Sequence, residues 1–152
     1  MSDDEPGSTA PLSLEFLQTQ LGFNLRLAYS AMNRDFTGRL EELNLTQWQC
    51  ITLELIANNP GASQIEIAET LGIDRSSMMA IAEELNTRKL IARQRSKADG
   101  RRQELRLTAR GNAVLKQVRA LVREHDKYFT GRFSKRELGT LIGNLRRLHQ
   151  RF

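Results

Sequence analysis

The stretch that decides the fold is residues 64–81, QIEIAETLGIDRSSMMAI. Its apolar side chains recur at helical spacing on both sides of a central glycine, and they are Ile67, Leu71, Ile73, Met78 and Ile81. Gly72 stands where a turn with positive φ costs least, and Ala68 is small enough for two helices to cross there. The pattern predicts a helix-turn-helix, although a plain helical hairpin would fit the same apolar positions.

The second of these helices is expected to leave polar and small side chains exposed near its start, at Arg75, Ser76, Ser77, Met79 and Ala80. In a helix-turn-helix, this part of the second helix faces base edges in the major groove of DNA. Ser63, just before the first helix, is a further candidate DNA contact. Since Met79 and Ala80 offer no hydrogen-bond donor, specificity is expected to depend on the two serines, on apolar contacts with thymine methyl groups and on the next segment.

That next segment is a basic hairpin. Residues 91–95 and 103–107 have the pattern of two strands, and they flank the polar loop SKADGRR at 96–102. A basic two-stranded wing beside a recognition helix can reach the neighbouring minor groove. Phosphate contacts are expected from Arg75, Arg88, Arg93, Arg95, Lys97 and Arg102. Asp99 is placed to orient an arginine through a bidentate pair.

The charge is strongly asymmetric along the chain. Residues 1–87 carry 4 basic and 13 acidic side chains, whereas residues 88–152 carry 19 basic and 5 acidic ones, which leaves a net charge of +5. A basic half of this kind favours a polyanionic partner, although a basic run is often only a solvated face.

The 152 residues are 39% hydrophobic and 27% charged, which is typical of one soluble domain. No run approaches the roughly 18 apolar residues of a membrane span, so a cytoplasmic location is expected, with residues 1–11 disordered. One cysteine and two histidines are too few for a structural zinc site. Phosphate loops, nucleophile elbows and metalloprotease motifs are absent, so we expect neither an enzyme nor a cofactor.

Helix-start signals organise the rest of the chain. Capping boxes begin at Thr46, Ser63 and Ser134, and Asp74 caps a further helix. Another long helix is expected from Thr108 to about Tyr128, and a first helix from about Leu12 towards Asn33 or on to Leu43. The apolar seams at 115–129 and 138–152 present more apolar surface than a small winged helix-turn-helix can cover. This favours a homodimer over packing within one chain. The predicted organisation is a helical dimerisation region at 12–44 and 109–152 around a winged helix-turn-helix at 45–108.

Between Leu45 and Leu115 the chain resembles the MarR (multiple antibiotic resistance regulator) family. The resemblance is carried by residues 60–64 (PGASQ), 71–77 (LGIDRSS), 99–102 (DGRR) and 105–108 (LRLT), followed by Gly111. It implies a mainly α fold with a small β-hairpin wing, in a dimeric regulator that represses genes from a pseudo-palindromic operator. It also implies that Arg101 enters the minor groove and that Asp99 positions it.

The resemblance further implies release from DNA by a small aromatic acid or its coenzyme A thioester. Candidate ligand contacts are Phe23, Arg26, Leu27, Tyr29, Ser30 and Trp48, with Arg26 holding a carboxylate. The alternatives are packing in the core for each aromatic side chain and a solvated or salt-bridged side chain for Arg26.

Two other functions stay open. One is an architectural or protein-binding winged helix without an effector, and the other is a thiol-based redox regulator acting through Cys50. We expect Cys50 to be buried and inert, and His125 to be packed near the dimer interface.

Overall fold

The computed structural model describes residues 12–96 and 103–150. In chain order the elements are α1 (Glu15–Gln18), α2 (Leu21–Leu40), the 3-10 helix η1 (Glu41–Leu43), α3 (Gln47–Asn58), α4 (Gln64–Leu71), α5 (Arg75–Thr87), β1 (Ile91–Arg95), β2 (Gln103–Leu107), α6 (Ala109–Thr130) and α7 (Lys135–His149). The expected fold class, mainly α with one β-hairpin, is confirmed. No helix in these two ranges has both the length and the apolar character that a bilayer crossing requires.

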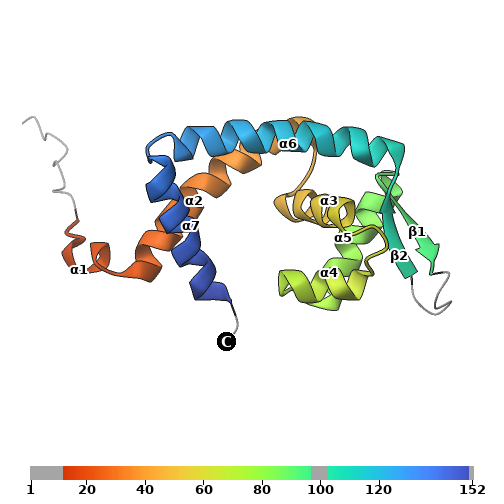
Figure 1. Ribbon diagram of the computed structural model, residues 1–152, viewed down its shortest axis with the longest axis horizontal. Helices are drawn as coiled ribbons and strands as arrows, with labels where there is room; N and C mark the ends of the chain where they lie inside the picture. Colours follow the sequence, from red (N-terminus) through yellow and green to blue (C-terminus); the bar gives the residue numbers. More distant parts are fainter. Residues whose placement is uncertain (1–11, 97–102, 151–152) are drawn as a thin grey trace, which may run out of the picture.

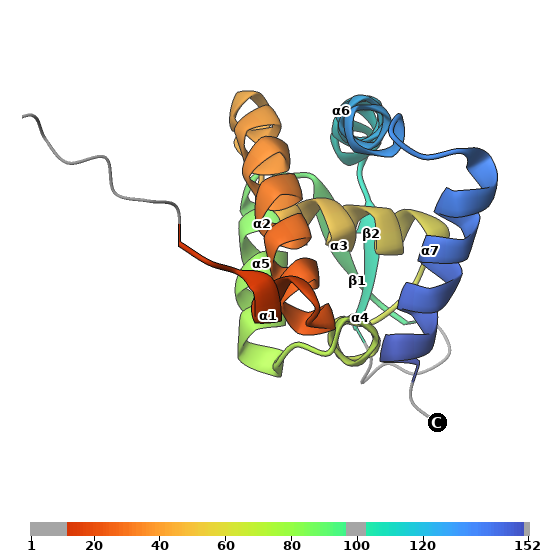
Figure 2. The same ribbon diagram turned by 90° about the vertical axis from the view of Figure 1, so that its left-hand side faces the viewer.

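Helix α6 spans much of the length of the molecule and connects its two ends (Figure 1). Helices α3, α4 and α5 and the hairpin form one end, which we call the head. The remaining elements, α1, α2, η1, α6 and α7, form the arm. Seen along α6, helices α2 and α7 descend on different sides (Figure 2).

Local side-chain caps set most of the helix starts. The side chains of Thr46, Ser63 and Ser134 each accept a hydrogen bond from the backbone N–H three residues on. The Gln or Glu side chain at that position accepts a second hydrogen bond from the backbone N–H of the cap residue. Asp74 and Thr108 cap α5 and α6 in the same way without the return bond. These starts were predicted from the sequence and are confirmed, as are the bounds of both strands.

The predicted first helix is wrong in its extent. Instead of one helix from Leu12, the chain forms α1 and then breaks before α2, with Gln20 in an extended conformation. The Asn24 side chain donates to the carbonyl oxygens of Gln18 and Gln20, both at 2.8 Å, and Thr19 donates to Phe16 at 2.7 Å. The break is favourable because these side chains satisfy carbonyls that a continuous helix would have paired.

The core lies in the head and where the head meets α2 and α6. Its most deeply buried apolar side chains are Leu40, Leu53, Ile56, Met78, Leu85, Leu90, Ile91 and Leu105. The two strands pair antiparallel, with Ile91 opposite Leu107 and Arg93 opposite Leu105. Gly111 allows α6 to touch the end of the head, since a Cβ atom there would lie 1.9 Å from the carbonyl oxygen of Leu90.

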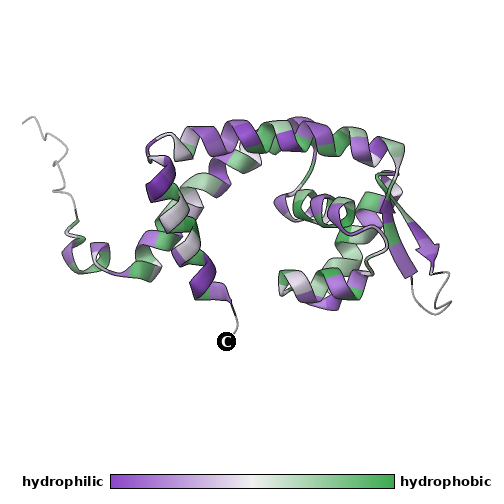
Figure 3. Cartoon of the chain, in the orientation of Figure 1, coloured by the Kyte–Doolittle hydropathy of each residue, from purple (hydrophilic) through white to green (hydrophobic). Residues whose placement is uncertain are grey.

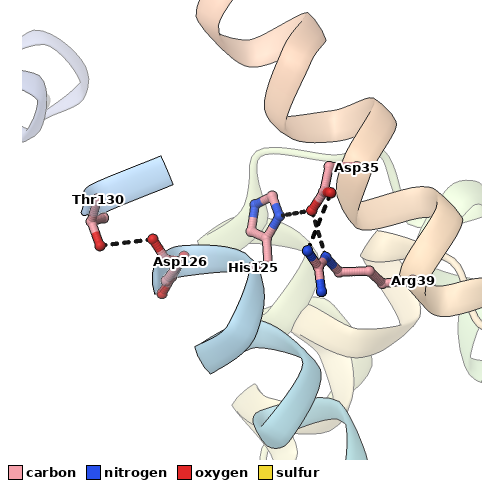
Figure 4. A network of polar contacts seen from close by, with 5 residues as sticks. All are labelled: Asp35, Arg39, His125, Asp126 and Thr130. Atoms are coloured by element: carbon pink, nitrogen blue, oxygen red, sulfur yellow. Dashed lines mark hydrogen bonds and ion pairs between the residues drawn. The ribbon is translucent and has the colours of Figure 1, made fainter. Parts of the chain in front are cut away.

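Within the arm, α2 and α6 are joined by a polar network (Figure 4). His125 Nδ1 lies 2.7 Å from Asp35 Oδ2, and Arg39 Nε donates to the same oxygen at 2.6 Å. The His125 ring packs at 5.1 Å from the Phe36 ring and at 5.0 Å from the Phe129 ring. The predicted packing of His125 inside an apolar seam is confirmed.

Candidate nucleic-acid interface

Helices α4 and α5 form the predicted helix-turn-helix. Gly72 adopts the left-handed conformation with φ of 66°, and its neighbour Ile73 donates to the carbonyl of Ala68 at 3.1 Å. Ala68 and Met78 are buried where the two helices meet. The small Ala68 side chain therefore lets α5 pack closely on α4, and Gly72 forms the turn between them, as the sequence predicted.

The start of α5 is open to solvent. All five side chains predicted to face DNA from this helix are exposed: Arg75, Ser76, Ser77, Met79 and Ala80. Met79 leaves 59% of its surface accessible, so its apolar side chain is free to contact a thymine methyl group. Ser63 is half-buried, and its hydroxyl donates to Glu66 at 2.9 Å within the capping box.

Asp74 holds the two serines of α5. Its carboxylate accepts from the hydroxyl of Ser76, from the Ser77 hydroxyl at 2.7 Å and from the Ser77 N–H at 2.8 Å. These bonds, that of Ser76 first, keep the pKa of Asp74 well below its usual range. The helix start facing solvent is thus rigid and carries a negative charge beside Arg75.

The hairpin is tied to α5 through Arg93. Its guanidinium lies 2.9 Å from the Glu83 carboxylate on α5, and the side chain is half-buried. Arg95, two residues further along β1, is exposed. The predicted contacts Lys97, Asp99, Arg101 and Arg102 lie outside the described residues.

Arg88, another predicted phosphate contact, is engaged within the chain. One guanidinium nitrogen donates to the carbonyl of Asn44 at 2.5 Å and another to that of Leu43 at 2.9 Å. The side chain is half-buried and points from the end of α5 to the end of the 3-10 helix η1. This geometry does not favour the predicted role of Arg88 as a free phosphate contact.

A cavity of about 520 Å³ lies between α2, α3 and α6. Its apolar side chains come from all three helices and are Met32, Phe36, Cys50, Ile51, Val118 and Val122. Glu54, Arg119, Arg123, His125 and Asp126 supply its charged and titratable groups. The size and the mixture of an apolar lining with a few polar groups are typical of a small-molecule site.

Arg119 and Glu54 form a bidentate pair at this cavity. Arg119 Nε and Nη2 donate to the two carboxylate oxygens of Glu54 at 2.9 and 2.8 Å. The Arg119 guanidinium lowers the pKa of Glu54. The pair connects α3 of the head to α6 of the arm, and the Glu54 carboxylate occupies the planar fork of Arg119.

The six predicted ligand contacts do not line this cavity. Phe23, Arg26, Leu27, Tyr29 and Ser30 lie on the first half of α2, and Trp48 lies near the start of α3. Phe23 is half-buried and the others are exposed, so the alternative of core packing does not hold for Tyr29 or Trp48. Sequence reasoning missed Arg119 and Arg123, whose spacing of four residues places them on one side of α6.

Cys50 is buried in the core, with 4% of its surface accessible. Burial raises the pKa of its thiol to about 11. A neutral, covered thiol is a poor nucleophile, so the structure disfavours redox sensing through Cys50 and agrees with its predicted packing.

Comparison with known proteins decides the family. The sequence model of the MarR family matches residues 43–102, which contain the helix-turn-helix and β1. A transcriptional regulatory protein for the hcr operon of Thauera aromatica is 37% identical over 132 residues, which cover 86% of this chain and 80% of the relative. The chain belongs to the MarR family. Its family and its fold are those of transcriptional regulators, not of enzymes.

Two solved structures of MarR-family regulators show the same fold. The transcriptional repressor CouR bound to a 23-mer DNA duplex is 32% identical, with a TM-score of 0.87 over 93% of this chain and 100% of that chain. CouR bound to p-coumaroyl-CoA is 31% identical, with a TM-score of 0.82 over the same shares. This MarR-family chain therefore shares its fold with a repressor that binds a DNA duplex.

Proposed function

We propose that this MarR-family protein is a homodimeric, sequence-specific repressor that an aromatic acid or its coenzyme A thioester releases from DNA. The observation that carries the proposal is the rigid, exposed start of α5, beside a basic hairpin, on a chain similar over 93% of its length to a repressor bound to DNA. Helix α5 enters the major groove and the hairpin reaches the adjacent minor groove.

The dimer is proposed because the arm leaves its apolar residues uncovered. Helix α7 buries no residue, although its sequence has apolar positions at helical spacing, and Leu141, Ile142 and Leu148 are each at least 40% accessible. A cavity of about 760 Å³ separates α7 from α2, with Leu21, Leu25 and Leu145 among its lining. Figure 3 shows apolar residues along both helices. A second copy of the arm would cover these surfaces.

The effector is proposed to occupy the cavity between α2, α3 and α6. A carboxylate ligand would compete with Glu54 for the planar fork of Arg119, and the apolar lining accommodates an aromatic ring. The similarity to CouR bound to p-coumaroyl-CoA supports an aromatic acyl thioester as one candidate, with the coenzyme extending out of the cavity. The cavity lies between head and arm, so an occupant can alter their relative position.

Fluorescence anisotropy tests the proposal. The purified protein is titrated against the DNA upstream of its gene and against scrambled DNA of equal length, at fixed near-physiological salt. A preference of about 10³ or more for the upstream duplex is expected of a specific regulator. Equal weak binding to both duplexes, and to duplexes enriched by in vitro selection, would favour the architectural alternative.

Isothermal titration then tests the effector. Benzoates, hydroxycinnamates and their coenzyme A thioesters are expected to bind and to lower the DNA affinity. Arg119→Gln is expected to weaken carboxylate binding, whereas Arg110→Gln, a change on the same helix away from the cavity, is the matched control. No heat with any of these compounds would contradict the effector class.

A further inference from the structure

Arg88 connects two parts of the chain that are far apart in sequence. It lies at the C-terminal end of α5, and its guanidinium donates to the carbonyls of Leu43 and Asn44, 45 and 44 residues earlier. These carbonyls belong to the end of η1, where helical pairing stops and Asn44 turns into the left-handed conformation with φ of 49°. Arg88 thereby joins the recognition helix to the end of η1, which follows α2 in the arm.

The surrounding surface is not closed by packing. A cleft of about 460 Å³ lies between these parts, with Thr37 and Glu41 on the arm side and Glu83, Glu84 and Thr87 on the α5 side. Close packing would fix the angle between two helices by itself, but an open cleft does not. Arg88 crosses this cleft, so its hydrogen bonds add to the apolar packing of Leu40 and Leu45 in setting the angle.

A second contact holds the same end of α5 inside the head. The Gln49 amide, at the start of α3, donates to the carboxylate of Glu84. Glu84 and Arg88 are four residues apart on α5 and so lie on the same side of that helix. Gln49 is itself buried and fixed in the capping box of Thr46.

The charges at the cleft oppose a phosphate there. Glu41, Glu83 and Glu84 all contribute to its lining. A phosphate placed there would be repelled by these carboxylates, and the repulsion increases where the dielectric constant is below that of water. The acidic lining favours the guanidinium in its present place and disfavours a DNA backbone.

We propose that Arg88 is a positioning residue that sets the angle of the recognition helix on the arm, and hence the spacing of the two half-sites that the dimer accepts. The inference rests on the proposed function. It replaces the expected phosphate contact at this residue.

A small rotation of α5 at its Arg88 end produces a large displacement of its DNA-facing start. Helix α5 has 13 residues and so is about 20 Å long. A rotation of about 10° at its Arg88 end moves its DNA-facing start by about 3.4 Å, which is one base-pair step. A small change of the helix angle at Arg88 is therefore enough to shift the preferred half-site spacing by one base pair.

The test uses the full-length protein and a half-site obtained by in vitro selection. Synthetic duplexes carry two copies of that half-site, with the centre-to-centre spacing varied one base pair at a time around one helical turn. Anisotropy gives the affinity of wild type, Arg88→Met and Arg95→Met at several salt concentrations. Arg95 is the matched control, because it is an exposed cation beside the same helix-turn-helix.

For Arg88→Met, the affinity at the preferred spacing is expected to fall about tenfold while neighbouring spacings change little, with the salt slope as in wild type. For Arg95→Met, the affinity is expected to fall equally at every spacing. Its salt slope becomes shallower by about 0.9 for each phosphate that the variant no longer neutralises. An unchanged spacing profile for Arg88→Met, with or without a shallower slope, would overturn the inference.

Arg88→Lys covers the case in which the methionine variant does not fold. It keeps the charge but lacks the planar fork that reaches both carbonyls. We expect a broader spacing profile at an unchanged salt slope, whereas a wild-type profile would overturn the inference. If wild type itself shows no preferred spacing, the proposed function fails instead.

Discussion

The imidazole of His125 lies 2.7 Å from the carboxylate of Asp35, a residue 90 positions earlier in the chain, and joins α6 to α2 inside the arm. Its side chain is 8% accessible and lies between two phenylalanine rings. The bond orients a polar ring within an apolar seam, so the arm gains a specific register between two helices as well as apolar contact.

His125→Ala is expected to lower the free energy of unfolding by roughly 2–4 kcal/mol. The change leaves a cavity between the aromatic rings and removes a partner of Asp35. Urea denaturation at fixed protein concentration measures the difference. His149→Ala, at an exposed position near the end of α7, is the control and should change stability by less than about 0.5 kcal/mol.

Acid is expected to weaken the same network. The Arg39 side chain first, and His125 second, lower the pKa of Asp35 below its ordinary value of 3.8. A carboxyl with a lower pKa in the folded state stabilises the protein at neutral pH and loses that contribution as the pH falls below about 4. Asp35→Asn should therefore be less stable at pH 7 and lose less stability between pH 4 and pH 2. Parallel pH curves for the two proteins would contradict this.

Peroxide is not expected to release the protein from DNA. Because burial raises the pKa of the Cys50 thiol to about 11, the thiolate is scarce at neutral pH. Labelling with a thiol reagent should be slow in the folded protein and fast in denaturant. Wild type and Cys50→Ser should have equal DNA affinity after peroxide treatment. A loss of affinity in wild type that is absent in Cys50→Ser would instead support the redox function.

Gly111→Ala is expected to destabilise the protein by more than about 2 kcal/mol. The added Cβ would lie 1.9 Å from the backbone oxygen of Leu90, and neither backbone can yield without moving α6 from the head. Gly38→Ala, in α2 with open space around the new atom, is the control and should stabilise by about 0.5–1 kcal/mol. Thermal unfolding of both variants measures the difference.

Arg101→Ala is expected to lower operator affinity by more than about 1 kcal/mol, the contribution of one good base contact. The proposed dimer should persist, because Arg101 lies between β1 and β2 in the sequence and not in the arm. Anisotropy and sedimentation together check both statements. Unchanged affinity would remove the wing from the proposed interface.

Features set by neighbours in sequence were predictable. The caps at Thr46, Ser63 and Ser134 act over three residues, and the two strands of the hairpin are close together in the sequence, so both follow from local pattern. The break before α2 was missed, because it depends on Asn24 reaching back to two carbonyls across a segment whose apolar spacing continues.

By itself the sequence determined the helix-turn-helix, the hairpin and the family, since these depend on residue type at short spacing. Only the tertiary structure decided which charged groups meet. Arg119 binds Glu54, 65 residues away in the sequence, and Arg88 binds the carbonyl of Asn44, 44 residues away. Arg119 is therefore a candidate ligand contact, whereas Arg88 is proposed as a positioning residue. A long cationic side chain has the same local pattern in either role, and its partner is fixed by how the helices pack.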